Sequence, residues 1–519
     1  MIEDSRRGAA VDDAGSARPA APDAAAAPPE RPPVAWLPVG LVAAAIAALL
    51  AGYASRYDYH RDELYFRLLA DHPAWGYVDQ PPLTPMLAKL AIAIFGDTAW
   101  AIRVPALVAV ATTTVLTALV ARELGGGRAA QVLAAAGVAS AFPLLVGHLL
   151  LTATTDLVVW LLVILFVMRA LLRDQPRYWL AAGAVAGVGL YNRHLVILLL
   201  LGLAAGLLLV GPRRVLATRW PWAGAALAVV IGAPNLIYQI ANGFPQLDMA
   251  AALAENKGDE ARPLFVPMQL VMLGVLLVPI WIAGLVTLLR DRRLRPVRAV
   301  AVAYPVVCVL LLAIAGQFYY TMGLVLALYA AGSVATVRWL AGRPWRWALV
   351  GAAVALNVVL SALISLPVLP VDVLARTPIP EINQATRDQI GWPEYVRQVA
   401  AVYQSLPPHE QVGAVIITGN YGEAGALVRY GGPYDLPAVY SGQNQLWHLG
   451  PPPPNTEVVI TVGAGGEAFH QASFERCFIA SRLENGVDID NEEQGVPVRI
   501  CHRPRESWDR LWPRFQHFD

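Results

Sequence analysis

The sequence predicts a polytopic α-helical membrane protein that carries a small α/β domain at its C-terminal end. Of its 519 residues, 56% are hydrophobic and only 15% are charged. The apolar residues gather in repeated runs of about 20, the length that a helix needs to cross a bilayer core of roughly 30 Å. After Pro370 the composition changes to that of a soluble domain. The net charge of +1 gives no indication of a nucleic-acid partner, so the position of the charges matters more than their sum.

The apolar runs divide at polar interruptions into eleven predicted spans. Residues 1–33 precede them and have almost nothing to bury, which predicts a disordered tail. No small-residue cleavage site clearly follows the first run, so we expect this run to be retained as a span rather than removed as a signal peptide. The predicted spans are 34–55, 99–121, 128–148, 151–169, 178–191, 194–210, 221–239, 264–289, 299–316, 318–337 and 346–367.

The charges of the connecting segments predict which side of the membrane each segment faces. One alternate set of connections holds 16 arginines against three acids, whereas acids outnumber bases in the other set. The positive-inside rule places the arginine-rich set in the cytoplasm. We therefore expect a cytoplasmic tail over 1–33, a membrane domain over 34–368 and an extracytoplasmic α/β domain over 369–519. The first outer loop, 56–98, is far longer than a helical hairpin requires, and such loops often carry function.

The C-terminal part alternates short apolar runs with one helical pattern, which indicates a small α/β unit. We expect strands within 411–418, 437–442, 455–463 and 496–504, and a helix over 421–431. The sequence "GNYGEAG" at the start of this helix is interpreted as a turn and helix cap rather than as a phosphate loop. Its spacing matches neither a Walker loop nor a dinucleotide fingerprint.

Whether the cysteines are expected to form a disulfide depends on the compartment that this domain faces. Cys477 and Cys501 lie in the polar C-terminal part, and the last predicted strand brings Cys501 near Cys477. Because the loop charges place the domain outside, where thiols are oxidised, we predict a disulfide between them. Cys308 lies inside an apolar run and is predicted to be an inert core residue.

The first outer loop begins with a short charged helix, "RDELYFRLLAD" (61–71). Its first turn holds Asp62 and Glu63, and Arg67 stands four residues from Glu63 and from Asp71. Two interpretations remain open. The segment is either an amphipathic helix at the membrane interface, with acids placed where the helix dipole favours them, or it carries a catalytic acid pair.

Other polar residues are predicted on the same outer side. The turn "GYVDQPPLTP" (76–85) precedes an apolar re-entry toward the membrane, where polar groups are tolerated if they line a cavity. Asp156 lies near the outer end of the fourth span, and acids within spans are costly enough to be functional candidates. Further polar and aromatic residues at outer span ends are His148, Asn192, Arg193, Tyr319 and Tyr320.

An outer cavity with carboxylates, cations and aromatic walls suits a sugar linked to a lipid phosphate. A carboxylate can take the proton of an attacking hydroxyl, and cations can offset charge on the departing phosphate. Apolar span surfaces can hold the lipid tail. Asp62, Glu63 and Asp156 could also hold a divalent metal ion through oxygen ligands, and no other cofactor is predicted.

Six segments taken in order resemble bacterial glycosyltransferase family 39. These enzymes use polyprenyl-phosphate sugars, have the GT-C fold, and are related to protein O-mannosyltransferases and to the lipid A aminoarabinose transferase. The segments are "RDELYF" (61–66), "GYVDQPPLTP" (76–85), "FGDTAWAIRVPAL" (95–107), "TTD" (154–156), "NYGEAGALVRYG" (420–431) and "YSGQNQ" (440–445).

The resemblance implies inverting transfer of a sugar from a polyprenyl phosphate to a hydroxyl of a glycan, lipid or protein, at a bacterial plasma membrane. It makes Asp62 the catalytic candidate, with Glu63 beside it and Asp156 as a further acid. The aminoarabinose branch has a Lys where this chain has Gln80, so other cations must bind the donor phosphate, and lipid A is disfavoured as acceptor. The candidate substrate-binding residues are Arg61, Tyr65, Asp79, Gln80, Lys89, Arg103, His148, Asn192, Arg193, Tyr319 and Tyr320.

Two alternatives belong to other functional classes. A lipid-linked sugar flippase or transporter predicts polar or broken helices at the bilayer midplane and symmetry-related repeats, and the sequence shows neither. A cell-envelope assembly protein would use the α/β domain to recruit wall polymer and would not need the set of acids in the membrane domain.

Overall fold

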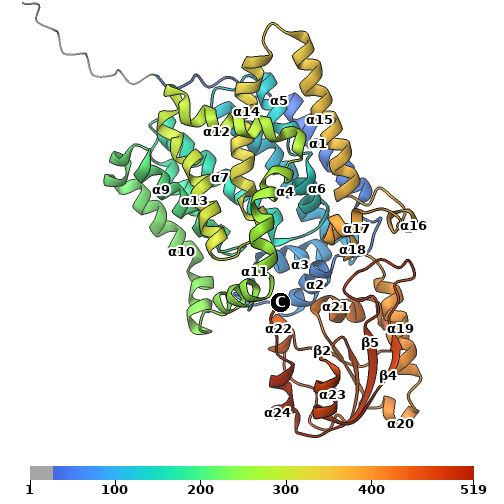
Figure 1. The fold of residues 1–519 in the computed structure, drawn as a ribbon. Helices are drawn as coiled ribbons and strands as arrows, with labels where there is room; N and C mark the ends of the chain where they lie inside the picture. The colour runs from blue at the N-terminus through green and yellow to red at the C-terminus, as the bar shows by residue number, and fades with distance from the viewer. Residues whose placement is uncertain (1–26) are drawn as a thin grey trace, which may run out of the picture.

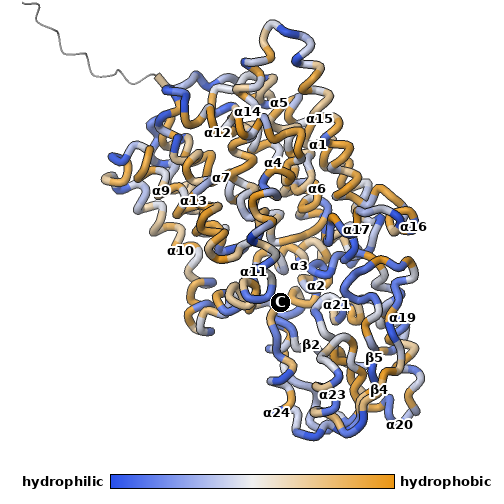
Figure 2. The backbone as a smooth tube through the Cα atoms, in the orientation of Figure 1, coloured by the Kyte–Doolittle hydropathy of each residue, from blue (hydrophilic) through white to orange (hydrophobic). Residues whose placement is uncertain are grey.

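The computed structural model of this chain describes residues 27–519, so most of the predicted tail lies outside the described residues. A helical body occupies one end of the described molecule and an α/β domain the other (Figure 1). The body is mainly hydrophobic, and hydrophilic segments gather at its ends and over the α/β domain (Figure 2).

Seven helices are long and apolar enough to cross a membrane, and two bent helix pairs raise the number to nine if each pair is one span. Both pairs bend by 64°. The other two predicted spans are helical but only 12 and 14 residues long, so seven to nine helices of the described chain, rather than eleven, are long enough by themselves to cross. The long helices are α1 (Trp36–Tyr53), α4 (Ala99–Glu123), α7 (Thr152–Leu172), α10 (Arg219–Ala241), α13 (Arg298–Ala313) with η3 (Arg292–Val297) before it, α14 (Met322–Leu340) with η4 (Phe318–Thr321) before it, and α15 (Pro344–Ser365). One bent pair is α5 (Arg128–Ala136) with α6 (Ala141–His148). The other is α11 (Pro245–Val271) with α12 (Val278–Arg290), and η2 (Val275–Leu277) lies between these two helices. The short helices are α8 (Tyr178–Gly189) and α9 (Val196–Leu209), and η1 (Arg213–Ala217) follows α9.

Small residues let the membrane helices approach closely. A Cβ atom added to Gly284 of α12 would lie 1.8 Å from the carbonyl oxygen of Leu328 in α14, and one added to Gly332 would lie 1.7 Å from that of Ile280. Such backbone contact is a usual way for helices to associate where lipid removes the hydrophobic driving force.

The arginine-rich turns lie at the end of the body opposite the α/β domain. There the buried Glu123 accepts hydrogen bonds from Arg169 at 3.2 Å and Arg173 at 2.7 Å. Arg173 also donates to the carbonyl of Pro29 at 2.7 Å, which fixes the chain that leads into α1. The two sets of connections therefore face opposite ends of the body, as their charges predict.

The α/β domain contains a five-stranded mixed sheet in the order β2-β1-β3-β5-β4. Strands β2, β1 and β3 are parallel, and β5 is antiparallel to both β3 and β4. The strands are β1 (Val415–Thr418), β2 (Val439–Ser441), β3 (Val458–Val462), β4 (Phe474–Arg482) and β5 (Pro497–Pro504), of which β4 was not predicted. The helices are α16 (Val371–Leu374), α17 (Ile379–Ile382), α18 (Gln384–Arg387), α19 (Trp392–Gln404), α20 (Pro408–Gln411), α21 (Tyr421–Tyr430), α22 (Asn444–Trp447), α23 (Glu467–Ser473) and α24 (Trp508–Leu511), with short turns η5 (Gly432–Tyr434) and η6 (Trp512–Phe515).

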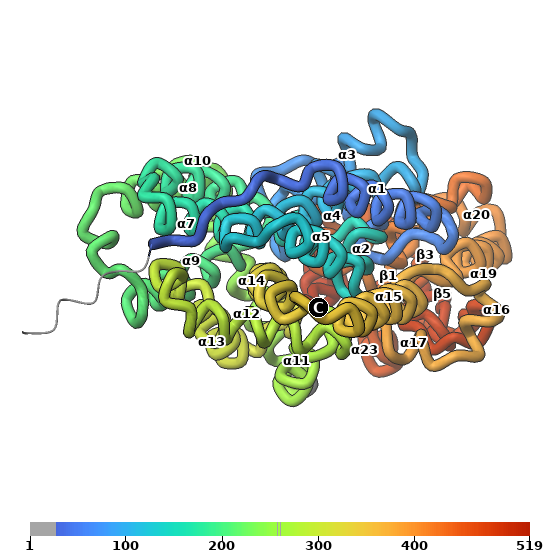
Figure 3. The backbone as a smooth tube through the Cα atoms, turned by 90° about the horizontal axis from the view of Figure 1, so that it is seen from above, coloured from blue at the N-terminus to red at the C-terminus, as the bar shows by residue number. Residues whose placement is uncertain are grey.

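The first outer loop belongs to the core of this domain. Its helix α2 (Arg61–Asp71) buries Leu64, Phe66 and Leu69 in one cluster with α19, α21 and the facing side of the sheet. Figures 1 and 3 place α2 between the membrane helices and the sheet. It is therefore not an amphipathic helix lying free at the interface. Arg67 pairs with Asp97, the residue after α3 (Leu83–Phe95) and Gly96, and not with the predicted partners four residues away.

Candidate active site

Asp62 lies in the first turn of α2, where a local capping arrangement starts the helix. The His60 side chain accepts a hydrogen bond from the Asp62 backbone N–H, and the Glu63 carboxylate accepts one from the His60 backbone N–H. The Asp62 side chain keeps 32% of its surface exposed. The Tyr421 hydroxyl donates to Asp62 Oδ1 at 2.9 Å, so a residue of the α/β domain touches this acid.

Glu63 points the other way and is completely buried. It accepts three hydrogen bonds from Arg103 of α4, the shortest at 2.8 Å, and another from the Leu150 backbone N–H at 3.0 Å. Arg103 is equally buried and also donates to the carbonyls of Ala54 and Asp58, at 2.8 Å each. This ion pair joins α2 to α4 and leaves neither partner facing open space.

The polar turn after α2 forms a wall beside Asp62. Asp79 accepts hydrogen bonds from the Tyr65 hydroxyl at 3.1 Å and the Asn444 side-chain amide at 3.5 Å. Burial raises the pKa of Asp79 to about 7, with a smaller contribution from the charge of Asp62. Gln80 is buried, and its Nε2 has no hydrogen-bond partner among the described residues.

A second polar group lies where the outer span ends meet. Asp156 is buried in the first turns of α7 and interacts electrostatically with Arg193 of the α8–α9 connection. The Arg193 guanidinium lies 4.7 Å from the ring centre of Tyr320 and 5.9 Å from that of Tyr319. The charge of Asp62 acts weakly on Tyr319, so the two polar groups are neighbours.

The remaining candidates hold the framework together. Lys89 donates to the carbonyl of Ala70 at 2.9 Å and so caps the end of α2. His148 is buried between Arg103 and Gln389. Asn192 accepts hydrogen bonds from threonines of α3 and α7, at 3.2 and 2.5 Å. The structure thus brings together Arg61, Asp62, Tyr65, Asp79, Gln80, Asp156, Arg193, Tyr319 and Tyr320, and places Glu63, Lys89, Arg103, His148 and Asn192 around them.

The sequence interpretation did not assign the contribution of the α/β domain. Tyr421 contacts Asp62, Asn444 contacts Asp79, and Gln445 accepts a hydrogen bond from the Val78 backbone N–H at 3.0 Å. All three belong to the segments "NYGEAG" and "YSGQNQ". Polar residues in these segments were the available signal, but nothing in the sequence indicated what they face.

An apolar cavity of about 630 Å³ opens beside this site between α3, α4, α7 and α8. Its walls include Leu90, Ile94 and Val108, which are exposed on the outer face of the helical body. One wall residue, Thr155, neighbours Asp156 in the chain. A hydrocarbon chain in this cavity would therefore end close to the polar site.

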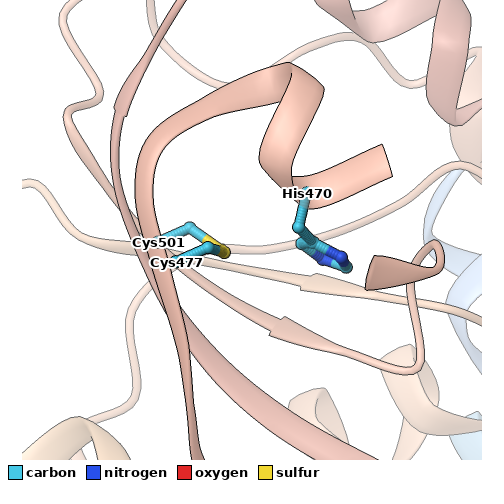
Figure 4. A group of neighbouring side chains, drawn as sticks. All are labelled: His470, Cys477 and Cys501. Atoms are coloured by element: carbon cyan, nitrogen blue, oxygen red, sulfur yellow. A yellow bond between two sulfur atoms is a disulfide. The ribbon is translucent and has the colours of Figure 1, made fainter. Parts of the chain in front are cut away.

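The three acids considered as metal ligands do not gather in the part of the chain that the structure describes. The one group found there with suitable spacing is His470, Cys477 and Cys501, whose ligand atoms lie within 4.8 Å of one another (Figure 4). The two cysteines lie opposite each other on β4 and β5 and are joined by a disulfide. The two ring nitrogens of His470 contact the Thr461 hydroxyl at 3.0 Å and the Gly466 carbonyl at 2.8 Å. All three side chains therefore already have partners within the protein.

Comparisons with known proteins agree with this architecture. Residues 79–238 match the dolichyl-phosphate-mannose-protein mannosyltransferase family, PMT_2. The crystal structure of ArnT from Cupriavidus metallidurans bound to undecaprenyl phosphate is similar over 89% of this chain and 97% of that chain, with 16% identity and a TM-score of 0.58. Its apo state covers the same shares, with 15% identity and a TM-score of 0.59.

A more distant likeness is to the Archaeoglobus fulgidus oligosaccharyltransferase in complex with Zn and sulfate. It has 15% identity and a TM-score of 0.50, and the match covers 84% of this chain and 69% of that chain. No curated protein sequence matches the chain.

The family match over residues 79–238 and the fold are both those of multi-pass membrane glycosyltransferases with the GT-C fold, the class that the sequence predicted. The family matched by residues 79–238 is the one to which the sequence resemblance to glycosyltransferase family 39 pointed.

Proposed function

We propose that this protein transfers a sugar from a polyprenyl phosphate to an acceptor hydroxyl, with Asp62 as general base. The observation that carries the proposal is the position of Asp62, a partly exposed carboxylate whose Oδ1 is held by the Tyr421 hydroxyl and whose charge acts on Tyr319. The acceptor oxygen attacks the anomeric carbon as the bond from that carbon to the phosphate oxygen breaks. The acceptor proton passes to Asp62, and the electron pair leaves on the lipid phosphate. Attack from the face opposite the phosphate inverts the anomeric centre.

Arg193 is the candidate that supports phosphate binding best among the four cations considered. Arg103 is saturated by Glu63 and backbone carbonyls, and Lys89 is held by the end of α2. Arg61 is paired with Glu492. Arg193 instead lies against two tyrosine rings near Asp156, where its guanidinium can meet a phosphate. Arg193 would then bind the phosphate in place of the Lys that the aminoarabinose branch has where this chain has Gln80.

The apolar cavity between α3, α4, α7 and α8 suits the polyprenyl chain. Its walls are almost entirely hydrocarbon, and its Thr155 end adjoins Asp156 and so the proposed phosphate site. The structural likeness to ArnT, which is known bound to undecaprenyl phosphate, supports this placement.

Replacing Asp62 by Asn tests the general base directly. The amide keeps the shape of the side chain but cannot take a proton, so turnover of a purified undecaprenyl-phosphate sugar is expected to fall about 10²- to 10⁴-fold. Asp71→Asn, at the exposed end of the same helix, should retain the wild-type rate and serves as the matched control. Near-normal turnover by Asp62→Asn, with wild-type thermal unfolding, would remove Asp62 from this role.

We propose that the α/β domain faces the extracytoplasmic side, because the arginine-rich turns lie at the opposite end of the body. In a variant with Cys308→Ala, a membrane-impermeant maleimide should label Gly432→Cys in intact cells. Ala341→Cys, in the α14–α15 turn, should be labelled only after permeabilisation. The reverse pattern would invert the topology.

A further inference from the structure

Helix α2 of the first outer loop and helix α21 of the α/β domain approach closely in their first turns. A Cβ atom added to Gly422 would lie 2.8 Å from the Cβ of Arg61, and one added to Gly425 would lie 2.7 Å from the Cβ of Leu64. Asn420 caps α21 through the Glu423 backbone N–H, and Glu423 closes a capping box. This confirms the interpretation of "GNYGEAG" as a turn and cap. The close approach sets Tyr421, the first residue of α21, beside Asp62.

Tyr421 is fixed in this place by its ring, its backbone and its hydroxyl. Its ring stacks on that of Tyr65 with a centre separation of 4.5 Å, and its backbone N–H donates to Gln443 at 2.8 Å. Arg61 Nε donates to the Tyr421 hydroxyl oxygen at 3.3 Å. The hydroxyl proton is thereby directed at Asp62 Oδ1. Burial, and then the charge of Asp62, raise the pKa of Tyr421 well above its usual value, so the hydroxyl keeps its proton.

We infer that Tyr421 is a positioning residue for Asp62, and that the α/β domain is thus an integral part of the active site. The inference rests on the proposed function of Asp62. By holding Oδ1, the hydroxyl fixes the rotation of the carboxylate and leaves Oδ2, which accepts no hydrogen bond from the described residues, to the acceptor hydroxyl. A hydrogen bond to a charged acceptor is stronger and more directional than a neutral one. Small errors in the placement of a reacting group are costly in rate.

Tyr421→Phe tests this role because it deletes the hydroxyl and keeps the stacked ring. With the full-length protein and undecaprenyl-phosphate sugar, kcat is expected to fall about tenfold to hundredfold. The KM for the lipid donor should stay at the wild-type value, since Tyr421 does not contact the proposed phosphate site. Tyr395→Phe is the matched control: it lies in the same domain, is buried, and has a hydroxyl without a partner among the described residues.

Each outcome separates the inference from the function on which it rests. A wild-type kcat in Tyr421→Phe, with Asp62→Asn inactive, would overturn the role of Tyr421 and leave the general base intact. If Tyr421→Phe also unfolds at a lower temperature, and its kcat falls only in proportion to the unfolded fraction, the contact is merely structural. That result would also overturn the role of Tyr421. If Asp62→Asn itself remains active, the proposed function is wrong, and the role of Tyr421 goes with it.

Discussion

Asp62 and Glu63 are neighbours in the chain with opposite surroundings. Successive helix positions are turned by about 100°, so one carboxylate faces the partly open site and the other faces α4. Glu63 has no exposed surface and is saturated by Arg103 and the Leu150 backbone. We propose that Glu63 stabilises the site by fixing α2 to α4, and that only Asp62 of this pair takes part in proton transfer.

Glu63→Gln should therefore affect folding more than chemistry. Removing one charge of a completely buried pair leaves the other uncompensated and costs about 3–5 kcal/mol. We expect a large drop in the thermal unfolding temperature of the detergent-solubilised protein, whereas Asp62→Asn should unfold like wild type. A Glu63→Gln protein that is as stable as wild type yet inactive would point to a direct role in transfer.

At the scale of elements, the contact between α2 and α21 fixes how the outer loop meets the α/β domain. The two helices share one hydrophobic cluster, and glycines bring their backbones together where any larger residue would push them apart. The distance between Asp62 and Tyr421 is therefore set by packing rather than by a flexible side chain.

Gly425→Ala should separate these helices. The new Cβ would meet the backbone of Leu64 at 2.9 Å, a clash that rotating a side chain cannot relieve. Overpacking of this kind costs about 1–3 kcal/mol, and we expect activity to fall at least tenfold while membrane insertion is retained. Gly432→Ala is the control, because a Cβ there meets nothing within 4 Å. Unchanged activity of Gly425→Ala would mean that the interface adapts.

At the scale of the whole molecule, acids are buried between the body and the domain. Asp388 and Glu493 lie near Arg61, and burial raises the pKa of each to about 7. Their ordinary values are 3.8 and 4.5, so the folded state binds more protons than the unfolded state over the interval up to about pH 7. The contribution of these two acids to stability must then fall as pH rises through this interval.

Asp388→Asn isolates this contribution, because the amide has no proton to lose. In thermal unfolding in detergent, the midpoint of the variant should rise relative to that of the wild type between pH 5 and pH 8. Each unit of raised pKa corresponds to about 1.4 kcal/mol, so the difference should be measurable. The same pH dependence in both proteins would contradict a raised pKa for this buried acid.

The sequence predicts the architecture well because bilayer length and loop charge are local signals. Its count of eleven spans exceeds the seven to nine helices that are long enough by themselves to cross, since the apolar runs of α8 and α9 form helices of only 12 and 14 residues. Strand β4 was missed because most of its residues are exposed or only partly buried, so it lacks an apolar run.

The site was predictable only in part. The acids of the first outer loop stand out in an apolar chain, but their partners do not. Arg103 lies 40 residues from Glu63, and Tyr421 lies 359 residues from Asp62, so only the folded chain shows which acid is paired and which is presented. Arg103 was predicted to bind substrate because its charge is visible in the sequence, while its burial is not.

The contact between Asp62 and Tyr421 also has a consequence for the order of synthesis. A ribosome adds Asp62 to the chain 359 residues before Tyr421, and every membrane-spanning helix after α1 lies between the two residues. If the contact is needed for transfer, a nascent chain can insert all its helices and bind the polyprenyl-phosphate sugar without transferring the sugar. The enzyme would then transfer sugar only after its C-terminal domain has crossed the membrane and folded, so incompletely synthesised copies would remain inactive in the membrane.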